Sequence, residues 1–148
     1  MAAATSVVVL DRGNNTTCTI NLHVSKRYSM GRKPLEEAFH SFFTRDNQIF
    51  QEGRDVVTVC EWTDRIYQNT QPEHIITNVV SGRKMRVQKY NFPDTVVWNP
   101  WQEKARDIPD FGDDEFPNMI CVESGHVSSP VILLPGTAFE ASQILQVM

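Results

Sequence analysis

Apolar side chains in this chain recur at every second position over short runs, which is the spacing that a half-buried β-strand produces. Cys18, Ile20 and Leu22 alternate with polar residues, and Val57 and Val59 do the same. Prolines fall between such runs, and because proline cannot donate to a strand ladder, they separate strands. The predicted strands cover residues 6–10, 18–22, 57–60, 74–80, 84–90, 95–99, 118–123, 131–134 and 139–145. This pattern predicts an all-β sandwich or barrel with few or no helices.

One segment departs from the period of two. Leu35, Phe39 and Phe42 lie on one face of a helical wheel, and Pro34 stands where a first helical turn accepts it. Residues 34–43 therefore predict a short helix.

Two connections are also predicted. Ser81 and Gly82 separate the strands 74–80 and 84–90, and because glycine accepts positive φ, they favour a tight hairpin turn. Residues 102–116 form a polar, acidic loop, and an ordered loop of this length is usually functional or mobile.

Composition limits the class of protein. With 148 residues the chain has the size of a single domain, residues 1–148, with a sizeable core. A net charge of −4 argues against nucleic acid or an anionic membrane as the main partner. The first residues lack the features of a signal peptide, and no apolar run is long enough to span a bilayer. Cys18, Cys60 and Cys121 are widely spaced in apolar runs, which predicts buried free thiols in the cytoplasm and no metal site.

Glu123 is the strongest candidate for chemistry, because it directly follows the apolar run of residues 119–122. A carboxyl group desolvated there would have a raised pKa and could act as a general base near neutral pH. The alternative is a glutamate on an edge strand that faces water.

Other polar and aromatic residues have two interpretations each. His40 could be a general acid or a histidine packed beside the core, and Asp64 could bind a sugar hydroxyl or pair with Arg65. Trp98, beside Asn99, could stack on a pyranose ring or anchor the core. The remaining histidines are predicted at the surface or in turns; they include His74 and His126.

Four blocks of sequence, in this order, resemble the glucose-6-phosphate 1-epimerase family, the hexose-phosphate branch of the aldose 1-epimerase superfamily. They are Thr-Asp-Arg-Ile-Tyr-Gln-Asn-Thr at 63–70, Val-Val-Trp-Asn-Pro-Trp at 96–101, Asp-Phe-Gly-Asp-Asp at 110–114 and Met-Ile-Cys-Val-Glu-Ser-Gly-His at 119–126. The resemblance covers about residues 55–145 and implies the antiparallel β-supersandwich fold of galactose mutarotases.

The resemblance also implies roles for residues. Glu123 would take the proton of the anomeric hydroxyl, and His40, placed on a strand, would protonate the ring oxygen. Asp64 would hold the sugar, with Trp98 and Asn99 completing a sugar-binding platform. These roles need no cofactor or metal, and the implied partner is a hexose 6-phosphate such as glucose 6-phosphate, bound by a cytoplasmic monomer.

The chain is shorter than members of that family. It lacks the segment rich in Arg and Gly-Gly-Ile-Pro that grips the 6-phosphate, and only 24 positions separate His40 from Asp64. We therefore expect an incomplete sandwich and two possible functions. One is interconversion of the α and β anomers of hexose 6-phosphates, and the other is a non-catalytic carbohydrate-binding β-domain.

Overall fold

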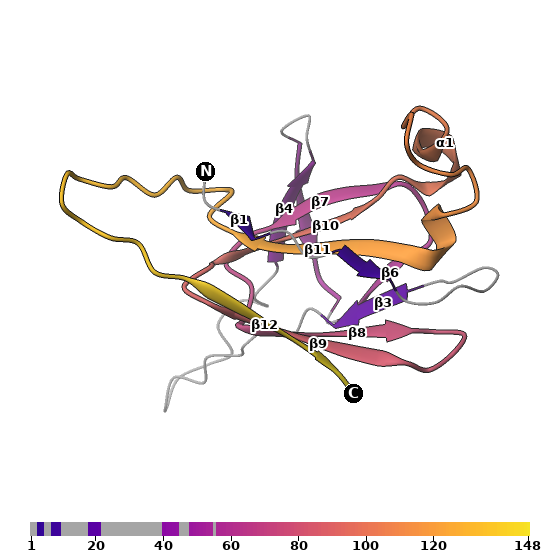
Figure 1. The fold of residues 1–148 in the computed structure, drawn as a ribbon, viewed down its shortest axis with the longest axis horizontal. Helices are drawn as coiled ribbons and strands as arrows, with labels where there is room; N and C mark the ends of the chain where they lie inside the picture. The colour runs from indigo at the N-terminus through magenta and orange to yellow at the C-terminus, as the bar shows by residue number, and fades with distance from the viewer. Residues whose placement is uncertain (1–2, 5–6, 10–17, 22–39, 45–47, 55) are drawn as a thin grey trace.

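A computed structural model describes residues 3–4, 7–9, 18–21, 40–44, 48–54 and 56–148 of the chain. Its regular structure is almost entirely antiparallel β-strand in two stacked sheets (Figure 1), which confirms the predicted all-β fold. The elements are β1 (Ala3–Ala4), β2 (Val7–Val9), β3 (Cys18–Asn21), β4 (His40–Thr44), β5 (Ile49–Glu52), β6 (Val56–Val59), β7 (Thr63–Tyr67), β8 (Glu73–Asn78), β9 (Lys84–Tyr90), β10 (Asp94–Asn99), the helix α1 (Trp101–Ala105), the 3₁₀ turn η1 (Phe116–Asn118), β11 (Met119–Gly125) and β12 (Ser142–Val147).

The chain passes back and forth between the two sheets. Sheet A has seven strands in the order β1-β11-β10-β7-β4-β5, with β2 also paired to β11. Sheet B has five strands in the order β12-β9-β8-β3-β6. Thus β7, β10 and β11 belong to one layer, and the strands between or after them, β8, β9 and β12, belong to the other.

The core lies between the facing sides of the two sheets. It contains Val57, Val59, Ile76 and Val87 from sheet B, and Tyr67, Val97, Ile120 and Val122 from sheet A. Each strand contributes every second side chain to this core. The burial of strand β8, for example, alternates residue by residue, because successive side chains point to opposite faces of a strand. Full burial of each such side chain stabilises the fold by roughly 1.5–3 kcal/mol.

Several predictions of local structure are wrong. Residues 40–43 are strand and not helix, because β4 pairs with β5 and β7; the rest of the predicted helix, residues 34–39, lies outside the described residues. Residues 131–134 form no strand. The predicted hairpin between β8 and β9 is present, and Gly82 has the expected positive φ, +71°, but the loop has five residues and is not a tight turn. A hydrogen bond from the Gly82 N–H to the Asn78 carbonyl closes it.

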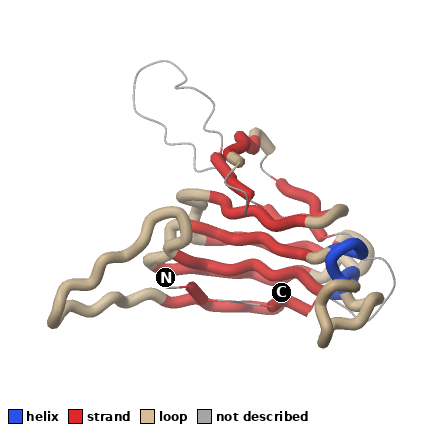
Figure 2. Tube along the Cα trace, turned by 90° about the horizontal axis from the view of Figure 1, so that it is seen from above, coloured by secondary structure: helices blue, strands red, loops and turns tan. Residues whose placement is uncertain are grey.

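A long arm, residues 126–141, connects β11 to β12 and extends beyond the ends of the strands (Figures 1 and 2). Ile132, Leu133 and Leu134 in this arm are 85%, 56% and 66% exposed. None of the helices in the described part of the chain has the length and apolar character needed to cross a membrane.

Candidate functional site

The outer face of sheet A, the face turned away from sheet B, carries three of the predicted site residues. Trp98 on β10 lies directly opposite Asp64 on β7 and opposite Cys121 on β11. Glu123 lies two residues beyond Cys121 and therefore on the same face. Asp64, Trp98 and Glu123 are all partly buried.

These side chains lie close to one another on the sheet. Asp64 and Glu123 are separated by two strand spacings and two residues along the ladder, which puts their Cα atoms roughly 12 Å apart. Two carboxyl groups and one indole ring therefore share one face, and such groups can accept hydrogen bonds from hydroxyl groups and pack against an apolar ring face.

The charge of Glu123 affects the pKa of Cys121, which lies two residues before it on β11. Burial raises the pKa of the Cys121 thiol to about 11, and the negative charge of Glu123 adds to this rise. Cys121 is therefore a neutral, buried thiol at physiological pH and acts as a small apolar side chain under the site. Cys60, in contrast, is exposed, so the prediction that all three cysteines are buried is wrong.

Asn99 does not belong to the outer face. It is 2% exposed, and its side chain fastens the end of β10 to the start of β11. Asn99 Nδ2 donates to the Phe116 carbonyl at 2.9 Å and to the Met119 carbonyl at 2.7 Å, and Asn99 Oδ1 accepts from the Trp101 N–H at 2.8 Å. With these bonds made inside the protein, Asn99 holds the frame of the site and is not positioned to bind a sugar.

The strand ladder does not bring His40 to the position opposite Glu123. Glu123 is in register with Val96, Val96 with Ile66, and Ile66 with Phe43. His40 lies three residues before Phe43, at the start of β4, where its backbone is in register with Glu52 of β5.

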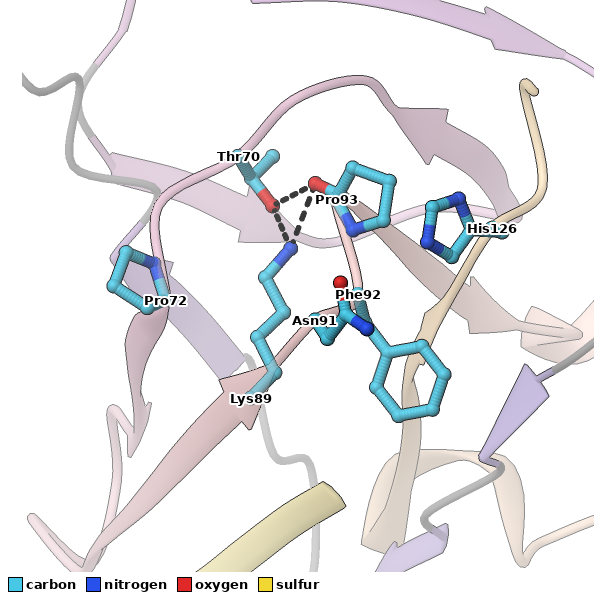
Figure 3. A pocket seen from close by; sticks show the side chains of 7 residues that line it. All are labelled: Thr70, Pro72, Lys89, Asn91, Phe92, Pro93 and His126. Atoms are coloured by element: carbon cyan, nitrogen blue, oxygen red, sulfur yellow. Dashed lines mark hydrogen bonds between the residues drawn. The ribbon is translucent and has the colours of Figure 1, made fainter. Parts of the chain in front are cut away.

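A second polar cluster, which the sequence analysis missed, lies between the sheets at one end of the sandwich. Lys89 is 2% exposed, and its ammonium group donates to Thr70 Oγ1 at 2.6 Å and to the Pro93 carbonyl at 2.9 Å (Figure 3). It also donates to the Asp94 carbonyl at 3.1 Å. Burial lowers the pKa of Lys89 to about 7, and the charge of Asp94 opposes that shift. Lys89 therefore ties sheet B to the segment leading into sheet A.

His74 belongs to the same cluster and corrects the prediction that it lies at the surface. It is 1% exposed, and its Nε2 lies 2.9 Å from Thr95 Oγ1, which in turn lies 2.7 Å from Thr70 Oγ1. The alternation of β8 places His74 in line with Ile76, and this was a signal that the residue faces the core.

Asp94 anchors the connections around this cluster. Its carboxylate is fully buried and accepts hydrogen bonds from the backbone N–H groups of Asn69, Val127 and Ser128, and from the Ser128 hydroxyl. One side chain thus holds the turn after β7 and the root of the arm.

A pocket of about 300 Å³ lies beside this cluster (Figure 3). Its walls include Lys89, Thr70, Phe92 and His126, and the His126 ring packs edge-on against Phe139, with 5.4 Å between centroids. Among the described residues, no group of three or more His, Cys, Asp or Glu side chains could hold a metal ion.

Comparison with known proteins agrees with the fold and the sequence blocks. A family model described as aldose 1-epimerase matches residues 11–146. A protein of Cenchrus ciliaris named "Putative glucose-6-phosphate 1-epimerase" is 38% identical over 87 residues, which are 59% of this chain and 26% of that protein. A Salmonella typhimurium protein of the same name is 27% identical over 75 residues, 51% of this chain and 26% of that protein.

A solved structure shows the same fold. The crystal structure described as a "putative mutarotase (YeaD)" from Salmonella typhimurium superposes with a TM-score of 0.64 at 19% identity, covering 82% of this chain and 36% of that one. The two stacked antiparallel sheets, with acidic and aromatic side chains on an outer face, define a β-supersandwich protein of the mutarotase type. The chain belongs to the aldose 1-epimerase family. It spans about a quarter of the length of the curated relatives it matches.

Proposed function

We propose that this chain acts on hexose 6-phosphates as a glucose-6-phosphate 1-epimerase, interconverting their α and β anomers, with Glu123 as the general base. The observation that carries the proposal is the register of β7, β10 and β11, which gathers Asp64, Trp98 and Glu123 on one face. The curated relatives named as glucose-6-phosphate 1-epimerases supply the substrate class.

The proposed reaction requires two proton transfers. Glu123 removes the proton of the anomeric hydroxyl while an acid protonates the ring oxygen, so the ring C–O bond breaks and an open-chain aldehyde forms. Rotation about the bond to the aldehyde carbon and closure on its other face return both protons. A positioned acid or base contributes typically about 10²–10⁴-fold to such a step.

His40 is the proposed acid, on the strength of the family resemblance. His40 lies on β4, which pairs with β7, the strand that carries Asp64. Asp64 and Trp98 are proposed to hold the sugar.

The same outer face of sheet A also supports a second candidate function. A chain that uses Asp64, Trp98 and Glu123 only for binding would hold a carbohydrate without opening its ring. This alternative is a non-catalytic carbohydrate-binding domain, which would bind the sugar but would not interconvert its anomers.

Exchange NMR on glucose 6-phosphate separates the two functions, because it measures the rate at which the α and β anomers interconvert. The enzyme predicts exchange above the uncatalysed rate that falls by at least about 10²-fold in Glu123→Gln. Glu103→Gln is the matched control, since Glu103 is an exposed glutamate on α1. Binding of the sugar, seen as shifts of the Trp98 indole signal, without any exchange would support the binding domain. Neither binding nor exchange would refute both functions.

A cytoplasmic location is part of the same proposal. Cys60 and Cys121 are free thiols, and Cys60 is exposed, as expected in a reducing compartment.

A further inference from the structure

One continuous chain of hydrogen bonds runs through the polar cluster between the sheets. Lys89 Nζ lies 2.6 Å from Thr70 Oγ1, which lies 2.7 Å from Thr95 Oγ1. Thr95 Oγ1 in turn lies 2.9 Å from His74 Nε2. All four side chains are buried. The chain therefore links two basic groups of sheet B, on β8 and β9, through a hydroxyl group of β10 in sheet A.

The ammonium group of Lys89 fixes the direction of this chain. It has three N–H donors and no acceptor, and it donates to Thr70 Oγ1 and to two backbone carbonyl groups. Thr70 Oγ1 therefore accepts from Lys89 and gives its own hydrogen to Thr95. The other neighbours of Thr70 Oγ1, His74 Nε2 at 3.4 Å and a carbonyl at 3.5 Å, lie beyond the usual range for a hydroxyl donor. Thr95 then donates to His74, so His74 Nε2 is the acceptor at the end of the chain.

A second arrangement satisfies the same groups equally well. If His74 Nε2 carries the proton, it donates to Thr95, Thr95 donates to Thr70, and Thr70 donates to the lone pair of a neutral Lys89 amine. The two N–H groups left on that amine can keep the two carbonyl groups. With both ends neutral, each hydroxyl would donate outward and the two oxygens would face each other at 2.7 Å without a hydrogen between them. The chain is therefore fully hydrogen-bonded when it holds one proton at either end.

The Lys89 end of the chain adjoins solvent. Thr70 and Lys89 line the open pocket of about 300 Å³ (Figure 3), so a proton can enter or leave there. Burial lowers the pKa of Lys89 to about 7, against the opposing charge of Asp94, so the lysine is able to give up its proton near neutral pH. A histidine also ordinarily titrates in this range, which makes the two ends suitable partners for one proton.

Three other titratable groups in the described part of the chain lie on the elements around this cluster. Tyr67 of β7 is in register with Thr95 and stays neutral, because burial raises its pKa. The Asp94 carboxylate of β10 is fully used by hydrogen bonds from other backbone and hydroxyl groups, and these bonds are the same in both arrangements. His126 lines the pocket, and the tests below remove it.

We propose that Lys89, Thr70, Thr95 and His74 form a buried proton relay that holds one proton and passes it between the lysine and the histidine. In the transfer an N–H bond of Lys89 breaks as an O–H bond forms on Thr70. Thr70 passes its own hydrogen to Thr95, and Thr95 passes its own to His74 Nε2, so no proton enters or leaves. His74 Nδ1 and its contacts do not change. The position of the proton decides whether the pocket wall is cationic or neutral, and this device is independent of the outer face of sheet A.

Nitrogen NMR of the ¹⁵N-labelled chain tests the relay, because the frequencies of His74 Nε2 and Lys89 Nζ report the share of the proton on each. We expect the two shares to add up to about one over a plateau around neutral pH, with at least about a tenth on each residue. Independent groups would instead lose their protons one after the other. A His74 Nε2 that stays bare across the plateau, or shares that do not add up to one, would overturn the proposal.

Three variants locate the path of the proton. Thr95→Val keeps the shape of the side chain but cuts the relay, so the share on His74 should fall below about a tenth. Thr63→Val is the matched control, because Thr63 is a buried threonine of β7 whose hydroxyl bonds a carbonyl outside the cluster, and the shares should not change. His126→Gln should leave them unchanged as well. If the share on His74 persisted in Thr95→Val, the proton would not travel through the hydroxyl groups and the relay would be refuted. The measurement on the unmodified chain depends on no variant.

Discussion

Asp94→Asn is the substitution that should reveal how much of the stability depends on the buried polar cluster. The variant keeps the shape of the side chain but removes its charge and replaces one acceptor oxygen with an NH₂ donor. Three hydrogen bonds converge on Asp94 Oδ2, from the N–H groups of Val127 and Ser128 at 2.9 and 2.7 Å and from the Ser128 hydroxyl at 2.7 Å. A fourth reaches Asp94 Oδ1 from the N–H of Asn69 at 3.2 Å.

The expected loss follows from these four bonds. Either orientation of the asparagine leaves at least one buried donor facing another donor, which costs roughly 1–3 kcal/mol, and the remaining bonds lose their charge assistance, about 1 kcal/mol each. With one bond lost and three weakened, the total is roughly 4–6 kcal/mol of unfolding free energy, or a fall in Tm on the order of 10–20 °C for a domain of this size.

Urea unfolding followed by tryptophan fluorescence measures this loss. Asp113→Asn is the matched control, because Asp113 is an exposed loop residue, and surface substitutions usually change stability by less than about 0.5 kcal/mol. If Asp94→Asn lost less than about 1 kcal/mol, Asp94 would not anchor the arm and the β7–β8 turn as described.

Substitutions at three further positions test other parts of the fold. Because burial lowers the pKa of Lys89 to about 7 in the folded state, the unfolded chain binds one more proton between pH 7 and its ordinary value of 10.5. Stability should therefore rise with pH across that window by up to about 1.4 kcal/mol per pH unit, and urea titrations at several pH values should show this slope reduced in Lys89→Met. Ile76→Ala, at a fully buried core position, should cost about 2–5 kcal/mol in the same assay, and a cost below 1 kcal/mol would contradict tight core contacts at that position. Asn69 has φ +50° and an exposed side chain, so thermal unfolding should show Asn69→Gly near neutral and Asn69→Val destabilised by about 1–3 kcal/mol; equal effects would argue against a left-handed conformation there.

The fold class followed from the sequence because alternation and proline punctuation are local signals. Strands with a clear period of two, such as residues 84–90, match the structure. The prediction for β4 was wrong, because Phe39 and Phe42 also fit a helical wheel. Only the pairing with β5 and β7 decides between helix and strand for residues 40–44. Residues 131–134 are apolar enough for a strand, but no strand in the described part of the chain pairs with them.

For the candidate site, the sequence predicted the kinds of residue better than the face of the sheet on which each residue lies. Trp98 and Asn99 are consecutive on one strand, so alternation alone puts them on opposite sides of sheet A, and the prediction that both bind the sugar overlooked this. Lys89 has the same parity as Val87, which was a signal of burial. The partners that make a buried lysine tolerable, Thr70 and two carbonyl groups, come from other segments and could not be predicted without the fold.

The length of the arm, residues 126–141, can change without a change in the arrangement of the two sheets. One of its ends is fixed by Asp94 through Val127 and Ser128, and the other enters β12 in the ladder with β9, while its apolar middle is exposed. Since doubling the length of a flexible loop costs only about 0.6 kcal/mol, residues could be added to or removed from this middle part without displacing either sheet. The arm is therefore where an inserted peptide, a fluorescent label or an evolutionary insertion should be tolerated best.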